Sequence, residues 1–277
     1  MYQLNALFFY RPLFFSELLL AESLFVFNLK RRDHFLLRVL LSVLFCLGVS
    51  FAFPILYYNA IYLSFMCFCF AAVSFFALLF CFDCKAINLV FCVLSGYATE
   101  HIAYSIYQLL MVLTLLDGGN SLNIYGSGDS VDLNGLVLSI YIEIYVVVYL
   151  LSYLIFGRQM KKDNDFYLTN TWLFLLLLLL FVSAVTLNAI LVYSCDIKEN
   201  RIPLGVTFTY SIINCILVLS LMFKLKDDKK TKKELEVVKH LWNEDKEHYE
   251  LAKENIKIIN IKCHDLKHQI RAINTIS

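Results

Sequence analysis

The 277-residue sequence has little charge and only three prolines. Charged residues make up 17% of the chain and hydrophobic residues 60%. An average soluble domain has about 25% charged and 45–50% apolar residues. This composition excludes a single soluble domain, a disordered polymer and a disulfide-stapled secreted scaffold.

The charges that are present are distributed unevenly. Residues 224–277 hold 13 of the 24 basic and 10 of the 23 acidic residues, so the net charge of +1 hides a strong asymmetry. Such a chain is typical of a membrane protein with a water-exposed tail. We therefore predict an all-α fold, a polytopic transmembrane helical bundle over residues 1–223 followed by a long cytoplasmic coiled-coil helix.

Long apolar stretches define the predicted spans. A bilayer core is about 30 Å thick, so a spanning helix needs about 20 mostly apolar residues. The first stretch contains Glu17 and Glu22, and an amphipathic helix lying in the interface is its alternative reading, which would leave six spans instead of seven. The seven stretches are 13–29, 36–56, 60–82, 86–116, 135–156, 170–193 and 206–223.

Basic residues in the short connections predict the orientation. The connections after the first, third and fifth stretches contain Lys and Arg, whereas 54–59 and 117–134 contain neither. Because cytoplasmic loops accumulate Lys and Arg, the N-terminus is expected outside and the tail from Lys224 inside.

Three ionisable residues lie near the middle of two consecutive spans. They are Glu100 and His101 in the fourth span and Glu143 in the fifth. A charge at the centre of a spanning helix costs about 2.5–3.5 kcal/mol on insertion scales, and such residues usually mark function. Consecutive spans are expected to be adjacent, so these residues can form a ligand-sensing or proton-sensing cluster. The alternative is an interhelical hydrogen bond that holds the bundle together.

The tail shows a heptad repeat. One phase places apolar residues at eleven of twelve core positions, the exception being Asp245. Such a seam predicts a homodimeric coiled coil over Leu235–Ile273, with the polar core residue fixing register or permitting a switch. The core positions are Leu235, Val238, Trp242, Asp245, Tyr249, Ala252, Ile256, Ile259, Cys263, Leu266, Ile270 and Ile273.

This phase turns two histidines away from the seam. His264 follows the core residue Cys263, and His268 lies one helical turn further on the same side. Two imidazoles at i and i+4 can also bind zinc, as in a His-Glu-x-x-His motif, although Asp265 is shorter than glutamate and no third ligand is nearby. A further alternative is that both are plain surface residues.

The segment from Lys262 to Ile270, with the letters KCHDLKHQI, resembles the phosphoacceptor box of bacterial sensor histidine kinases of the GHKL class. The likeness is greatest to the subgroup with polytopic sensors, which includes the peptide-receptor kinases of quorum sensing. It implies that His264 accepts phosphate, that Asp265 orients the ring or takes its proton, and that His268 serves the reverse, phosphatase reaction. It also divides the tail into a linker, 224–262, and the start of a dimerisation and phosphoacceptor helix, 263–277.

The boxes that bind nucleotide and magnesium in such kinases are not found in these 277 residues. The resemblance therefore implies ATP and Mg²⁺ for a catalytic domain outside this chain and no cofactor within it, and we expect the chain to be part of a longer kinase. It also implies a bacterial plasma membrane, a response regulator as partner and an unknown external ligand, for which the resemblance alone suggests a peptide. Lipid contact is expected and a nucleic-acid partner is not. The alternative is a non-enzymatic receptor or transporter with a coiled-coil assembly tail.

Overall fold

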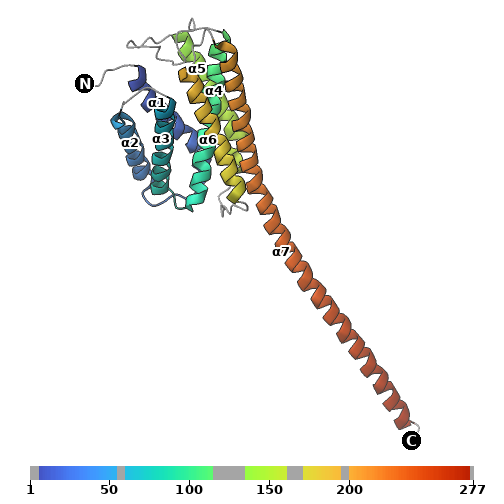
Figure 1. The fold of residues 1–277 in the computed structure, drawn as a ribbon. Helices are drawn as coiled ribbons and strands as arrows, with labels where there is room; N and C mark the ends of the chain where they lie inside the picture. Colours follow the sequence, from blue (N-terminus) through green and yellow to red (C-terminus); the bar gives the residue numbers. More distant parts are fainter. Residues whose placement is uncertain (1–5, 55–59, 115–134, 161–170, 195–199, 275–277) are drawn as a thin grey trace. The chain divides into compact units, whose positions relative to one another are not determined.

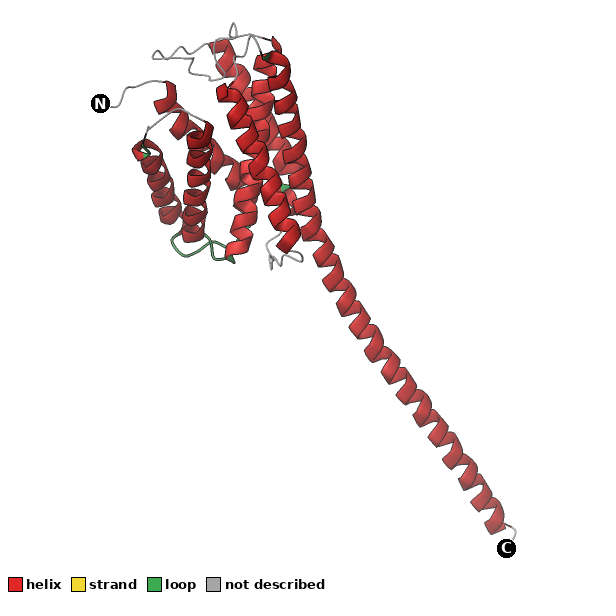
Figure 2. Ribbon diagram, in the orientation of Figure 1, coloured by secondary structure: helices red, strands yellow, loops and turns green. Residues whose placement is uncertain are grey.

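The computed structural model describes residues 6–54, 60–114, 135–160, 171–194 and 200–274, and every regular element within them is a helix (Figure 2). The predicted all-α class is confirmed. The chain divides into two units, Met1–Leu225 and Lys226–Ser277. The elements are α1 (Ala6–Val26), α2 (Phe35–Ala52), α3 (Ala60–Cys81), α4 (Ala86–Thr114), α5 (Gly135–Ile155), the short η1 (Gly157–Gln159), α6 (Thr171–Ser194) and α7 (Arg201–Asn274).

Six helices of the described part are long and apolar enough to cross a membrane. They are α2, α3, α4, α5, α6 and the first part of α7, up to Leu225. These correspond to six of the seven predicted stretches, in agreement with a multi-pass membrane protein. The other predicted span, 13–29, overlaps α1, which contains Arg11, Glu17 and Glu22 and is not one of the six.

Helix α4 forms the centre of the bundle. Every residue from 91 to 103 is buried, so the helix has no exposed face over more than three turns. It packs against α1, α3 and α5 (Figure 1), which confirms the expected adjacency of the fourth and fifth predicted spans. Close packing here depends on small residues, because apolar helices in lipid associate through tight van der Waals contact.

The tightest crossing lies between α1 and α4. A Cβ atom built on Gly96 would come within 2.7 Å of the Cα atom and 2.8 Å of the backbone nitrogen of Glu22. Neither backbone atom can move without shifting α1 as a whole. The absence of a side chain at residue 96 therefore sets the distance between the two helices.

Two of the basic connections meet at one end of the bundle. The backbone nitrogen of Asp83 donates to the carbonyl of Lys30 at 2.8 Å, and the backbone nitrogen of Arg32 donates to that of Cys81 at 3.2 Å. Lys30 and Asp83 also form an exposed ion pair at 2.9 Å. Their hydrogen bond and mutual attraction raise the pKa of Lys30 and lower the pKa of Asp83. Exposed ion pairs of this kind add little stability, so the two backbone hydrogen bonds are what hold the connections together.

The third basic connection and the bundle part of α7 reach this same end. The Asn28 side chain donates from Nδ2 to the carbonyl of Met160 at 2.6 Å. The ring of Phe223 lies 5.1 Å, between centroids, from the rings of both Phe91 and Phe156. The described parts of the connections after the first, third and fifth predicted spans thus lie at one end, as the predicted orientation requires. That this end faces the cytoplasm stays a prediction.

In the second unit, α7 is helical through the predicted heptad region as far as Asn274. The predicted helix is confirmed, whereas the pairing of two such helices stays a prediction. The seam side chains that the structure describes are exposed, with 67% for Trp242 and 68% for Tyr249. A row of exposed large apolar side chains on a soluble helix usually marks an interaction surface.

The close packing of Gly96 against Glu22 predicts that replacement of glycine by alanine changes the stability of the bundle differently at Gly96 and at Gly48. Gly96→Ala should destabilise the bundle by about 1–3 kcal/mol, because the added methyl overlaps the backbone of Glu22. Gly48→Ala in α2 should be neutral or stabilising by up to about 1 kcal/mol, because no atom lies within 4 Å of its new Cβ. Thermal unfolding of the purified chain in detergent measures both. Equal unfolding temperatures for the two variants would contradict the crossing.

Candidate functional site

Three carboxyl groups are buried inside the first unit. Glu17 and Glu22 come from α1, and Glu100 comes from α4. Acidic groups inside an apolar bundle need hydrogen-bond partners, because each unsatisfied polar atom there costs free energy. We refer to Glu17, Glu22 and Glu100, together with His101, as the buried polar cluster.

Glu17 connects α1 to α5. The Tyr141 hydroxyl donates to its Oε1 atom, and the Tyr149 hydroxyl donates to its backbone carbonyl at 3.0 Å. The rings of Tyr141, Tyr145 and Tyr149 follow each other along α5 at four-residue spacing, with centroids 4.4 and 5.7 Å apart. Since residues four apart share a helix face, α5 presents a column of hydroxyl groups to α1.

Glu22 connects α1 to α3. The Ser74 hydroxyl donates to its Oε1 atom at 2.6 Å, and Oε2 has no hydrogen-bond partner among the described residues. The side chain is fully buried, beside the Gly96 crossing. One of its two carboxyl oxygens is therefore satisfied and the other is not.

Glu100 and His101 lie next to a small cavity that is lined by α1, α3, α4 and α6. Asn188 of α6 approaches His101, with 3.1 Å from Nδ2 to Nε2, and donates to Ser105 at 3.4 Å. The cavity has a volume of about 40 Å³, which is room for roughly three water molecules. Glu100 is 1% exposed and Asn188 2%, and neither Glu100 Oε2 nor Asn188 Oδ1 has a hydrogen-bond partner among the described residues. The cavity thus has unsatisfied acceptors in its lining.

Glu143 does not belong to this cluster. It is exposed on α5, whereas Tyr141 and Tyr145, two residues to either side, are buried. Two residues correspond to about 200° of helix rotation, so Glu143 points away from the bundle when its neighbours point inward. The predicted grouping of Glu100 and His101 with Glu143 is therefore not formed, and Glu17 takes the place beside α5.

The two carboxyl groups of α1 are members of the site that the sequence did not predict. In the sequence, Glu17 and Glu22 count only against a membrane span. The available signal was two acidic residues in one apolar stretch together with tyrosines at i, i+4 and i+8 in another, at Tyr141, Tyr145 and Tyr149.

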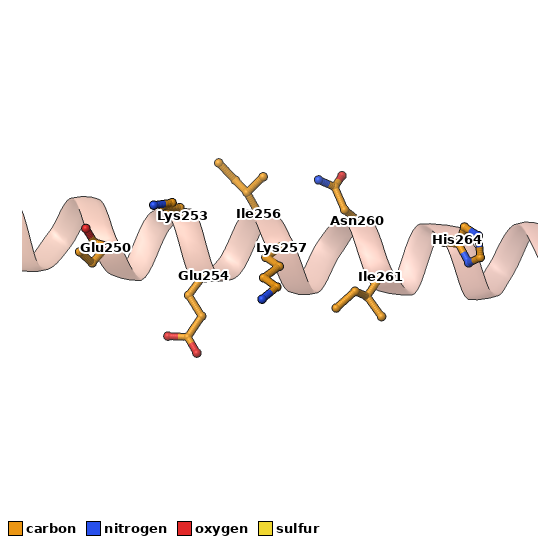
Figure 3. A pocket seen from close by; sticks show the side chains of 8 residues that line it. All are labelled: Glu250, Lys253, Glu254, Ile256, Lys257, Asn260, Ile261 and His264. Atoms are coloured by element: carbon orange, nitrogen blue, oxygen red, sulfur yellow. The ribbon is translucent and has the colours of Figure 1, made fainter.

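The second candidate site lies on the tail. His264 is exposed within α7, and it shares a face with polar residues (Figure 3). At 100° per residue, Glu250, Lys253, Lys257 and Asn260 lie within about 40° of it around the helix. A single helix has no opposite wall, so this face is an open surface and not an enclosed pocket. Asp265 and His268 lie within α7, but their side chains are outside the described part of the structure.

Comparisons with known proteins give no relatives. No family model matches the chain, and neither a curated protein nor a solved structure matches it.

The bond from Ser74 to Glu22 predicts a stability difference between two serines. Ser74→Ala should destabilise the bundle by about 1–3 kcal/mol, because it leaves a fully buried carboxyl group without its hydroxyl donor. Ser183→Ala in α6 is the matched control. Its exposed hydroxyl donates within its own helix to Leu180, and its loss should cost less than about 0.5 kcal/mol. Thermal unfolding in detergent compares them, and equal losses would argue against a structural role for the Glu22 bond.

Proposed function

We propose that this chain is the membrane sensor and phosphoacceptor part of a two-component histidine kinase, with His264 as the residue that is phosphorylated. The observation that supports this best is an exposed histidine, followed by an aspartate, on a helix whose heptad seam faces another direction. In this proposal the bundle lies in a bacterial plasma membrane and the tail in the cytoplasm.

The chemistry follows from the residue types. A neutral imidazole nitrogen is a good nucleophile near neutral pH. A ring nitrogen of His264 attacks the γ-phosphorus of ATP, a nitrogen–phosphorus bond forms, and the bond from that phosphorus to the bridging oxygen breaks, so that ADP leaves. Asp265 orients the ring or accepts its proton. An aspartate of a response regulator then takes the phosphoryl group, and His268 serves the reverse reaction.

Nucleotide and magnesium belong to a catalytic domain outside these 277 residues. Among the described residues, no group of three or more His, Cys, Asp or Glu is arranged to hold a metal ion. Since phosphoryl transfer depends mainly on positioning and on stabilisation of charge, that domain must place the γ-phosphoryl group against an accessible ring. His264 is exposed, so the acceptor ring is accessible to such a domain.

The sensing role is assigned to the buried polar cluster. Helix α4 contributes Glu100 and His101 to the cluster, and it also contacts α7 through the rings of Phe91 and Phe223. Phe223 is the last large core residue before the second unit begins at Lys226. Repacking around the cluster can therefore change the rotation of α7 at the end of the bundle, and a helix transmits such a rotation along its length.

Phosphorylation at His264 is tested with tail histidines as internal controls. The full chain in membranes is mixed with the soluble catalytic half of a related kinase and labelled ATP. Acid-labile phosphate should appear on the chain, disappear in His264→Gln and remain in His248→Gln, because His248 is also an exposed tail histidine but lies outside the box. Label that persists in His264→Gln, or no label on the unmodified chain, would favour the non-enzymatic receptor.

The tail dimer is tested through Cys263, which occupies a predicted core position and is exposed in the single chain. In a parallel coiled coil the same core residue of two copies meets across the seam. Mild oxidation should therefore link two chains through Cys263. In the matched control, Cys263→Ser combined with Ile261→Cys, the thiol is moved to the outer face and the linked dimer should be largely lost. Equal yields from the two positions, on denaturing gels, would contradict the predicted phase.

A further inference from the structure

Glu143 is unusual among the charged residues of the bundle. Within the described residues, it is the only exposed Asp, Glu, Lys or Arg away from the ends of the six candidate spans. It is the ninth of the 21 residues of α5, close to the middle of the helix. A polar group at this depth has no water to solvate it, so contact with lipid alone is unfavourable.

The residues around Glu143 form a continuous outer face of α5. Their spacing alternates between four and three residues, which is the heptad repeat of a helix that pairs with another helix. All are exposed except Ile140, which is half-buried, and Leu150 is 58% exposed. We call this surface the α5 outer face, and it consists of Leu136, Ile140, Glu143, Val147, Leu150 and Leu154.

A carboxylic acid can be its own partner. In its protonated form it donates through O–H and accepts through C=O, so two such groups can satisfy each other. In a two-fold symmetric interface, a residue that lies on the axis meets the same residue of the other copy. Interhelical hydrogen bonds between polar side chains are a known source of helix association in membranes. Glu143 is thus complementary to Glu143 of a second copy.

We propose that the α5 outer face packs against the same face of a second copy of this chain, with the two Glu143 carboxyl groups hydrogen-bonded across the two-fold axis. The other described outward surfaces of the spans carry apolar side chains, which lipid covers equally well, and hydroxyl groups such as that of Ser183, which bonds within its own helix. The α5 outer face carries a carboxyl group, which lipid cannot satisfy. The tail repeats the same design, a heptad seam with the single polar residue Asp245. The proposal involves no phosphoryl chemistry, so it holds or fails separately from the role of His264.

Photo-cross-linking of the full chain in membranes tests the face. A benzophenone amino acid is placed at Leu150, two turns from Glu143 on the same side, or at Leu179 of α6 as a matched control that is 70% exposed. Leu150 should give a covalent dimer whose cross-linked peptides both map to α5, and Leu179 should not. No dimer from Leu150, cross-links from Leu150 to lipid or another protein only, or equal dimer yields from the two sites would overturn the proposal.

Two substitutions at Glu143 test the carboxyl pair itself. With the benzophenone amino acid at Leu150, Glu143→Gln should keep the yield of cross-linked dimer, because an amide also donates and accepts hydrogen bonds. Glu143→Leu should weaken dimer formation about eightfold, the loss expected for two average interhelical hydrogen bonds. Both variants keep a side chain of similar size, and their amounts in the membrane are measured alongside. An undiminished yield in Glu143→Leu would overturn the pairing.

Discussion

The packing of the first unit depends on keeping three carboxyl groups inside an apolar bundle. Buried polar groups are tolerated only where hydrogen bonds replace the water that they lose. Glu17 obtains such bonds from α5, and Glu22 obtains one from α3. Both acids lie on α1, so this one helix is fixed from two sides. The close crossing at Gly96 then brings α1 against α4. The positions of α3, α4 and α5 around α1 therefore depend on these contacts.

The helices themselves were predictable, and their rotations were not. Runs of about 20 apolar residues predicted the six helices that are long and apolar enough to cross a membrane. The Lys and Arg residues predicted which connections lie at the same end. The side on which Glu143 lies could not be predicted from hydrophobicity, because the outer face of α5 also carries Leu, Val and Ile. In a soluble helix the polar face reveals the rotation, whereas in lipid both faces carry Leu, Val and Ile.

Hydropathy also gives no direction for Glu17 and Glu22, so the sequence did not predict α1 as part of the site. Charged residues lower the hydropathy of a segment whether they face lipid or the protein interior, so Glu17 and Glu22 counted against a span. Their burial is visible only when the partners Tyr141 and Ser74 are in place. The tail presents the opposite situation, because Lys, Glu and Asp surround its apolar seam. There the heptad pattern alone predicted the helix, and the Trp242 and Tyr249 side chains of the seam are exposed.

A polar cluster that is only partly satisfied suits a sensor better than a purely structural element. Glu22 Oε2, Glu100 Oε2 and Asn188 Oδ1 lack hydrogen-bond partners among the described residues. Each such buried group costs about 1–3 kcal/mol relative to a satisfied one. A ligand, a proton or a shifted helix that supplies one missing bond recovers a similar amount. Allosteric coupling between sites typically amounts to about 1–3 kcal/mol. In the proposed sensor, one recovered bond is therefore comparable to a typical coupling free energy. The contact of Phe91 with Phe223 places α7 against α4, the helix that carries Glu100.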